Sequence, residues 1–286
     1  MTSDLHNPRL PLNDGHEIES LIYGTSGLQG TIGMLAVRDA IRAGWRTIDT
    51  AQRYNNEMSV GMAIKESGVR REEITVISKI HGANHGLAHV RPSIIDSLRK
   101  LNLDVIDLML IHWPNPTIGL AIETWMALID AKADGLVRSI GVSNFANDQL
   151  DELIEATWVA PAVNQIPIDP WSQQVSWREH CHQRKVMPMA WSPSGFRAFK
   201  EDQVPAMVEM ETIAKNHDAT VHQIALAWHR HQGHVAVSGS TNEQRRAQNF
   251  ASLGIELTGD ELDAIANLRQ VTKHTDRFHP HQYEEW

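Results

Sequence analysis

Four side chains that could together move a proton stand at or near the ends of apolar runs. Asp49, Lys79 and His112 each end a run of strand length, and Tyr54 follows Asp49 after a short loop. A phenol can donate a proton to an oxygen that gains negative charge, although an ordinary phenol is a weak acid at neutral pH. A neighbouring ammonium lowers the pKa of a phenol, and a carboxylate keeps a buried ammonium charged. We therefore expect Lys79, held by Asp49, to activate Tyr54. His112 is expected to hydrogen-bond and orient the reacting oxygen.

Strand-like runs alternate with helical patterns along the chain, and this alternation must position the four side chains. Strands are expected near 20–24, 45–49, 74–79, 106–112, 137–142, 161–165, 187–191 and 234–238. Helices are expected to include 57–68, 88–101, 118–133, 147–156 and 173–184, with an extra helical region at 203–231 before the eighth strand. Eight strands alternating with helices predict an α/β fold, a (β/α)8 TIM barrel that binds ligands at the carboxyl ends of its strands.

Two further patterns complete the expected architecture. Residues 8–20 read as a β-hairpin around an Asn-Asp-Gly turn. In 88–101, helical spacing predicts one apolar face against the barrel wall, formed by Val90, Ile94, Ile95, Leu98 and Leu101. No linker or low-complexity tract divides the chain, so residues 1–286 are expected to form a single domain.

The segment 49–57, Asp-Thr-Ala-Gln-Arg-Tyr-Asn-Asn-Glu, resembles the signature of the aldo-keto reductase family. Lys79 and His112 fall where that family keeps its lysine and histidine, and further similar fragments follow in the family's order at 141–145, 163–165, 190–195 and 240–249. The resemblance extends from about residue 10 to about residue 270 and is to bacterial 2,5-diketo-gluconate reductase-like members. It implies that the hairpin plugs the barrel floor and that extra helices precede strand eight and follow it at the C-terminus. It also implies NADPH-dependent reduction of aldehydes or ketones, including keto-sugars, by hydride transfer with Tyr54 as proton donor.

The resemblance also implies a cofactor site in the second half of the barrel. Ser143, Asn144 and Gln165 would hold the nicotinamide carboxamide, and Trp191 replaces the usual tyrosine as a face for ring stacking. After the eighth strand, a helix start with free backbone amides would form an anion site, and Arg245 would reach a ribose phosphate. The full expected set of cofactor-binding residues is Gly24, Thr25, Asp49, Ser143, Asn144, Gln165, Trp191, Ser192, Ser194, Gly195, Gly239, Ser240, Thr241, Arg245, Gln248 and Asn249.

Some positions depart from the family pattern. Gly239 stands where the family often has a lysine for the 2′-phosphate, so NADP(H) is expected with NAD(H) possible, and Gly239→Lys is expected to widen the NADPH preference. Ser26 replaces a common pocket tryptophan. Pro167, Ile168 and Asp169 replace the more usual Glu, Tyr and His, and are expected to alter cofactor choice and pocket shape.

The substrate is expected to meet Tyr54, His112 and Trp113, with His81 at the mouth of the pocket. Trp171 is expected to pack in the core. The loops that would set the choice of carbonyl compound carry no transferable pattern, so the natural substrate stays open.

Composition excludes several other classes of protein. The net charge of −9 and the absence of a basic run argue against a nucleic-acid partner. The single cysteine, Cys181, fits a reducing compartment, and no apolar run is long enough to cross a membrane. We therefore expect a cytoplasmic monomer or weak homo-oligomer that binds a small carbonyl substrate. The 16 histidines follow no ligand spacing such as His-Glu-x-x-His, so no metal site is expected.

Two other functions remain open at this point. One is a cofactor-binding regulatory module with little turnover on the same barrel, as in the potassium-channel β subunits that resemble this family. The other is a metal-dependent barrel hydrolase that uses the histidines. A Rossmann dehydrogenase is disfavoured because the sequence contains no Gly-x-Gly-x-x-Gly.

Overall fold

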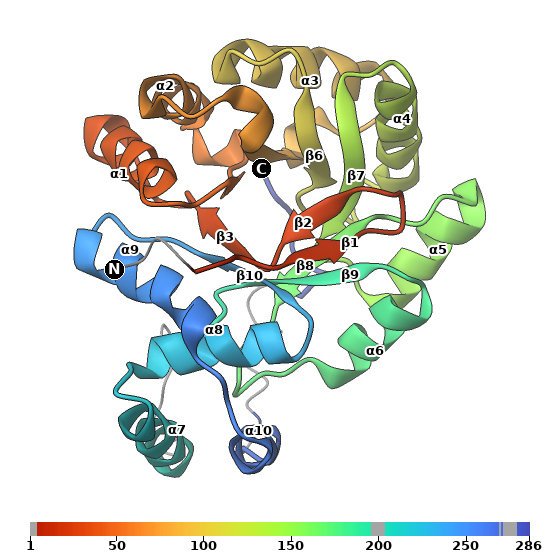
Figure 1. Ribbon diagram of the computed structural model, residues 1–286. Helices are drawn as coiled ribbons and strands as arrows, with labels where there is room; N and C mark the ends of the chain where they lie inside the picture. Colours follow the sequence, from red (N-terminus) through yellow and green to blue (C-terminus); the bar gives the residue numbers. More distant parts are fainter. Residues whose placement is uncertain (1–4, 196–203, 269, 271–278) are drawn as a thin grey trace.

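The computed structural model describes residues 5–195, 204–268, 270 and 279–286. Eight parallel strands close into a barrel in the order β10-β3-β4-β5-β6-β7-β8-β9 (Figure 1). The strands are β3 Leu21–Gly24, β4 Thr47–Asp49, β5 Thr75–Ile80, β6 Ile106–Ile111, β7 Val137–Ser143, β8 Val163–Pro167, β9 Met187–Trp191 and β10 Val235–Ser238. The predicted TIM barrel is therefore confirmed, and every predicted strand is present within two residues of its expected bounds.

Helices cover the outside of the barrel, which is why the strands are buried on both faces and read as nearly continuous apolar runs. They are α1 Gly30–Arg42, α2 Glu57–Ser67, α3 Leu87–Leu101, α4 Ala121–Ala133, α5 Asn147–Thr157, α6 Val175–Gln183, α8 Val221–His231 and α9 Glu243–Ala251. Helix α7 Val204–Asn216 precedes α8, and α10 Gly259–Ala266 follows α9, which confirms the extra helices. The capping box of Thr220 and Gln223 starts α8 and so divides the expected region 203–231 into two helices, with residue 203 outside the described part.

Parallel register brings the functional strand ends to the same edge. Gly24 is the register partner of Asp49 between β3 and β4, and Ser143 is the partner of Gln165 between β7 and β8. Between β10 and β3, the last and first strands of the barrel, Ser238 is the register partner of Tyr23. Residues far apart in the sequence therefore meet at the carboxyl end of the barrel.

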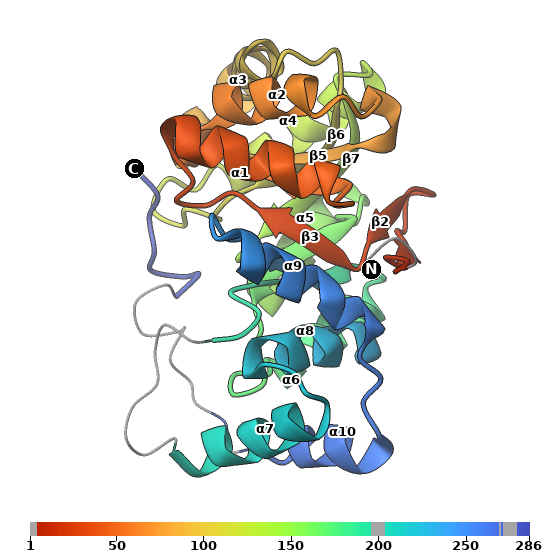
Figure 2. The same cartoon turned by 60° about the vertical axis from the view of Figure 1, so that its left-hand side comes forward.

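The N-terminal hairpin closes the other end of the barrel. Strands β1 Arg9–Pro11 and β2 Glu17–Glu19 pair antiparallel around the Asn-Asp-Gly turn. Leu12 and Ile18 are buried with barrel-interior residues such as Ile22 and Leu108. Figure 2 shows the hairpin and the segment 279–286 at opposite ends of the barrel. The hairpin thus plugs the floor and leaves the carboxyl end for ligands.

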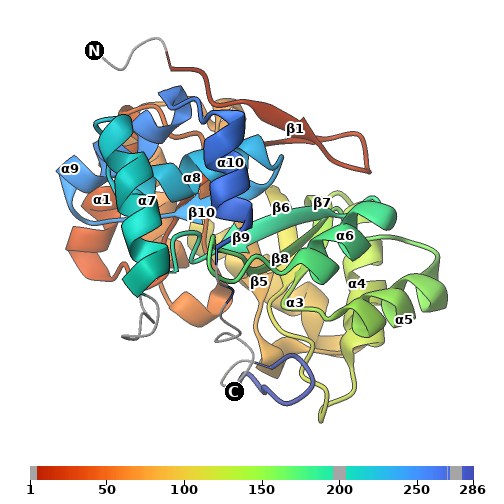
Figure 3. The ribbon, with the colours of Figure 1, turned by 90° about the horizontal axis from the view of Figure 1, so that it is seen from below.

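A second apolar cluster lies outside the barrel, beneath α8. Helices α7 and α10 lie side by side there (Figure 3), and Ile213 of α7 and Ile265 of α10 are buried with Trp228 of α8. Trp171 belongs to the same cluster and is 2% exposed, as expected for a packing residue. Among the described helices, none is both long and apolar enough to span a membrane.

Helix α1 was not among the ranges expected from the sequence, because Gly30 and Gly33 in its first turn lower the intrinsic helix propensity. Gly33 is nevertheless required, since a Cβ there would lie 2.6 Å from the backbone of Leu28. The expectation for α3 needs one correction, because Ile95 is 50% exposed and does not face the barrel wall. It lies about 100° around the helix from Ile94, which is fully buried.

Candidate active site

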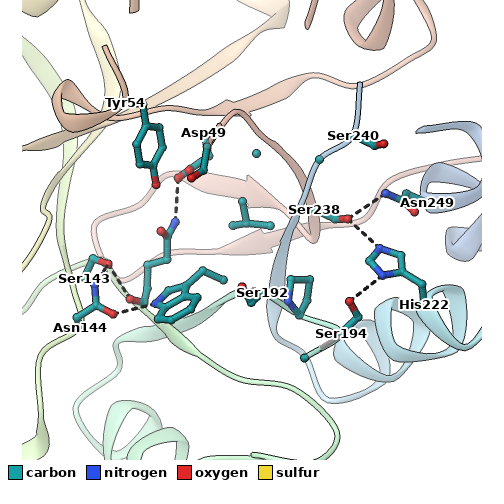
Figure 4. Close-up of a pocket in the computed structure, with 18 of the residues that line it drawn as sticks. Asp49, Tyr54, Ser143, Asn144, Ser192, Ser194, His222, Ser238, Ser240 and Asn249 are labelled. Atoms are coloured by element: carbon teal, nitrogen blue, oxygen red, sulfur yellow. Dashed lines mark hydrogen bonds between the residues drawn. The ribbon is translucent and has the colours of Figure 1, made fainter. Parts of the chain in front are cut away.

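A pocket of about 1100 Å³ opens at the carboxyl end of the barrel (Figure 4). Strand ends supply much of its lining, namely Gly24, Asp49, Ser143, Trp191 and Ser238, with His112 directly after β6 and Gln165 in the middle of β8 rather than at its end as expected. Tyr54 and Asp49 lie at one end of the pocket, and His222 and Asn249 lie at the other. One cavity therefore joins the ionisable groups beside Tyr54 to the polar groups beside His222.

Lys79 and Asp49 form an ion pair behind the pocket wall. Lys79 is fully buried, its Nζ lies 2.6 Å from Asp49 Oδ1, and it donates a hydrogen bond of 3.0 Å to the carbonyl oxygen of Thr50. Burial lowers the pKa of Lys79, but the Asp49 carboxylate and Tyr54 outweigh burial and leave the pKa above its usual range. Lys79 is therefore an ammonium at neutral pH, as expected from the sequence.

Tyr54 lies on the short 3-10 helix η1, Gln52–Tyr54, between Lys79 and His112. Lys79 Nζ is 5.1 Å from the centre of its ring, and the His112 ring meets it edge-on at 5.7 Å. Burial raises the pKa of Tyr54, and the opposing effects of Lys79 and a Ser26 hydrogen bond do not bring it down to the ordinary value of 10. The ammonium acts in the expected direction, but the expected net lowering does not occur. The phenol is protonated at neutral pH, which is the form a proton donor needs.

His112 is fixed from two sides. Asn144 Nδ2 donates to the backbone oxygen of His112 at 3.0 Å. The ring nitrogen Nδ1 lies 2.7 Å from Oε1 of Glu285, a carboxylate from the segment 279–286 that is itself 2% exposed. This carboxylate was not among the expected site residues, and it reaches His112 from the far end of the sequence.

A chain of hydrogen bonds joins the strand ends next to Tyr54. Ser143 Oγ donates to the Gln165 backbone oxygen at 2.8 Å, and Gln165 Nε2 donates to Asp49 Oδ2 at 2.8 Å. Trp191 Nε1 donates to Asn144 Oδ1 at 2.8 Å. The indole N–H therefore holds the ring of Trp191 in place, which accounts structurally for a tryptophan at this position. The same amide and hydroxyl groups could bond a carboxamide.

The other end of the pocket holds a second polar network. His222 of α8 lies 2.7 Å from Ser194 Oγ and 3.1 Å from Ser238 Oγ, and Asn249 Nδ2 donates to Ser238 Oγ at 3.0 Å. Burial, aided by the charge of Arg245, lowers the pKa of His222 to about 4, so its ring is neutral at pH 7. These groups could bond the sugar and phosphate oxygens of a nucleotide.

Helix α9 begins at the edge of this network. Asn242 caps it by accepting from the backbone N–H of Arg245 at 2.9 Å, and the exposed Arg245 and the partly buried Gln248 line the pocket. Gly239 lies against β3, where a Cβ would overlap the carbonyl oxygen of Gly24. A lysine at position 239 would therefore displace the backbone here, so the expectation that Gly239→Lys widens the NADPH preference stays a prediction that this substitution cannot test cleanly.

The pocket gathers most of the expected residues but not all of them. Thr25 is fully buried and donates to the backbone oxygen of Asp49, while Thr241 is exposed, and neither lines the pocket. His81 also lies outside the lining, where its Nδ1 accepts from Ala83 N. The three departures Pro167, Ile168 and Asp169 do not line the pocket, and the Asp169 carboxyl lies beneath Gly195. The expected cofactor and substrate residues that do line it are Gly24, Asp49, Tyr54, His112, Trp113, Ser143, Asn144, Gln165, Trp191, Ser192, Ser194, Gly195, Gly239, Ser240, Arg245, Gln248 and Asn249.

Several lining residues were missed by sequence reasoning. Ser238 ends β10 as Ser143 ends β7, so the rule that strand ends carry ligand contacts could have found it. His222 lies on a helix, and Tyr283 and Glu285 lie beyond the last helix, so no strand-end signal marks them. As for metal ligands, the described residues contain no cluster of three or more His, Cys, Asp or Glu side chains suited to one ion.

The family model for the aldo/keto reductase family matches residues 21–270. The chain belongs to this family and is an NAD(P)H-dependent oxidoreductase, which confirms the resemblance seen in the sequence. It is 40% identical over 263 residues to 2,5-diketo-D-gluconic acid reductase B of a Corynebacterium species, covering 92% of this chain and 94% of that protein.

Solved structures show the same likeness. An aldo/keto reductase from Brucella melitensis superposes with a TM-score of 0.87 at 37% identity, covering 92% of this chain and 98% of the other. A Bombyx mori aldo-keto reductase solved in complex with NADP gives a TM-score of 0.85 at 33% identity, covering 96% of this chain and 99% of the other.

Proposed function

We propose that this protein reduces small aldehydes, ketones or keto-sugars to alcohols with NADPH, and that residues 1–286 act as one barrel domain. The observation that carries the proposal is the position of Tyr54. Its protonated phenol lies in the pocket between the Lys79 ammonium, 5.1 Å from the ring centre, and the His112 ring at 5.7 Å. The pocket draws on residues from Gly24 to Glu285, so its function needs nearly the whole chain.

The residues present fit a nicotinamide nucleotide. The hydrogen-bonded groups of Ser143, Asn144 and Gln165 would hold the carboxamide, and Trp191 would offer a ring face. At the other end of the pocket, the start of α9 and Arg245 would take the adenosine phosphates. Arg245 favours NADPH, and the small Gly239 supplies no second cation, so NADH is a possible weaker cofactor.

The side chains divide the chemistry of carbonyl reduction among them. The bound cofactor would supply a hydride to the carbonyl carbon, which leaves a negative charge on oxygen. Tyr54 would donate its proton to that oxygen, and the Lys79 ammonium would stabilise the phenolate that remains. Asp49 keeps Lys79 charged in a buried position where an isolated ammonium would lose its proton. His112 would hydrogen-bond the carbonyl oxygen and turn it toward Tyr54.

The keto-sugar class is supported by similarity to the Corynebacterium protein, whose name gives a diketo sugar acid as its substrate. The test is a panel of aldehydes, ketones and keto-sugar acids assayed for oxidation of NADPH and of NADH by the purified protein. Turnover of at least one class with NADPH ahead of NADH supports the proposal. Tight cofactor binding without turnover of any carbonyl would favour the regulatory-module alternative, and activity that depends on added metal would favour a hydrolase.

A further inference from the structure

Among the described residues, two exposed cations line the pocket, and they lie toward its opposite ends. Of the Asp, Glu and Arg residues in the lining, Asp49 and Glu285 are each 2% exposed, whereas Arg53 and Arg245 are open to solvent. Arg245 lies near the start of α9 and acts on His222, at the end proposed for the adenosine phosphates. Arg53 directly precedes Tyr54, so it lies at the end where the carbonyl would react. Its charge takes no part in the proposed hydride and proton transfers.

The backbone around Arg53 is held in place on both sides. Gln52 Oε1 accepts from the backbone N–H of His81 at 2.9 Å. Gln29 Nε2 donates to the backbone oxygen of Tyr54 at 2.6 Å. Because Arg53 lies between these two anchored residues in η1, its side chain extends from a fixed point beside the proposed proton donor.

Arg53 has no acidic partner in the part of the chain that the structure describes. Its guanidinium forms no hydrogen bond and no ion pair with these residues. The two carboxylates in the pocket lining are already engaged, since Asp49 pairs with Lys79 and Glu285 Oε2 accepts from the backbone N–H of Gly82 at 3.0 Å. An anion that enters the pocket would therefore meet an unpaired guanidinium.

Several exposed arginines elsewhere on the molecule are paired. An ion pair with a nearby carboxylate is formed by each of Arg70, Arg91, Arg99, Arg138 and Arg184. Such partners are plentiful in a chain with a net charge of −9. An unpaired guanidinium in the pocket reverses the sign of this charge locally, which favours an anion that the rest of the surface would repel.

We propose that Arg53 binds a carboxylate of the substrate, so that the preferred substrates are aldehydes or ketones that carry an acid group. The proposal rests on the proposed reductase function and deepens it by naming a substrate class and the residue that selects it. A guanidinium donates two parallel N–H groups to the two oxygens of a carboxylate, which fixes direction as well as charge. With its carboxylate on Arg53, the substrate would present its carbonyl to Tyr54 and His112.

The aromatic walls at this end of the pocket suit such a contact. Trp113, directly after His112, packs against Tyr283 with ring centres 4.2 Å apart, and both residues line the pocket. Aromatic side chains can cover the carbon skeleton of a small acid and reduce the water around it. A charged contact is stronger where less water surrounds it. We therefore expect Arg53 to contribute more to binding than an ion pair on the open surface would.

The test measures kcat/KM with NADPH for 4-oxobutanoate and 5-oxopentanoate, each compared with its methyl ester, which keeps the aldehyde and lacks the charge. The wild type should favour each acid over its ester by about tenfold or more. In Arg53→Gln the acids should lose about tenfold in kcat/KM, through KM rather than kcat, because the carboxylate lies away from the reacting carbon. The esters and the affinity for NADPH should change little. Arg53→Lys keeps the charge without the paired N–H groups and should recover part of the preference.

Arg9→Gln is the matched control. Arg9 is likewise exposed and unpaired among the described side chains, but it lies on β1 at the closed end of the barrel. Its removal should leave the preference for acids as in the wild type, which separates contact with Arg53 from a change in net charge.

The ratio of acid to ester decides the outcome. The same ratio in the wild type and in Arg53→Gln, or an equal loss for acids and esters, would overturn the proposal. A wild type that reduces the esters without favouring the acids would also overturn it while leaving the proposed reductase function intact. A protein that reduces neither acids nor esters would contradict both.

Discussion

The pair of Lys79 and Asp49 allows stability and catalysis to be separated by a double-mutant cycle. Both side chains are at most 3% exposed and their charges lie 2.6 Å apart, so Lys79→Met leaves a buried carboxylate without its counter-ion. Breaking such a pair costs about 3–5 kcal/mol. Gln165 still donates to the other oxygen of Asp49, at 2.8 Å, so we expect the lower end, about 3 kcal/mol, of this range. That loss is a large part of the roughly 5–15 kcal/mol that stabilises a folded domain.

Replacing both charges should restore stability but not activity. Asp49→Asn combined with Lys79→Met removes the unpaired charge, so the double variant should be more stable to urea than Lys79→Met alone. Both variants should reduce carbonyls with at most about 1% of the wild-type kcat, because Tyr54 has lost its ammonium. Lys132→Met is the matched control, since its pair with Asp14 is partly exposed and is worth at most about 1 kcal/mol. The reasoning fails if Lys79→Met is as stable as the wild type, or if the double variant regains activity.

Three further predictions concern the cofactor and pH. Arg245→Ala should lower kcat/KM for NADPH about tenfold or more while changing that for NADH little, and equal losses for both would show that Arg245 does not contact the 2′-phosphate. Trp191→Ala should shrink the quench of protein fluorescence on cofactor binding, and an unchanged quench with unchanged affinity would place the nicotinamide elsewhere. Burial lowers the pKa of His229 to about 4 and that of His234 to about 2, below the unfolded value near 6.5. The unfolded chain therefore binds more protons, so the free energy of unfolding should fall as pH drops below about 6.5, by roughly 2–3 kcal/mol for His229 by pH 4. Urea titrations in which His229→Gln loses none of this pH dependence would contradict the assignment.

The barrel and much of its site could be predicted from sequence because parallel strands end at one edge. Asp49 and Ser143 each stand at the end of a strand, and the register of neighbouring strands places Gln165 of β8 beside Ser143. The rule needs only strand order and direction, which the alternation with helices supplies. Ser238 ends β10 and obeys the same rule.

Other features depend on contacts that spacing cannot show. Glu285 and His222 reach the pocket from a terminal segment and a helix, and only the packed structure places them there. The net pKa of Tyr54 depends on whether burial or Lys79 dominates, and burial is a property of the fold. The lack of room at Gly239 likewise comes from the close approach of β3.

The central claim is that Tyr54 donates the proton, and one substitution tests it most directly. Tyr54→Phe keeps the ring between Lys79 and His112 and removes only the hydroxyl. The measurement is kcat for NADPH-dependent reduction of the best carbonyl substrate at pH 7, with NADPH affinity measured alongside. We expect kcat to fall by about 10²–10⁴-fold in Tyr54→Phe, with NADPH affinity nearly unchanged. A Tyr54→Phe protein that folds, binds NADPH and keeps kcat within a few-fold of the wild type would contradict the account.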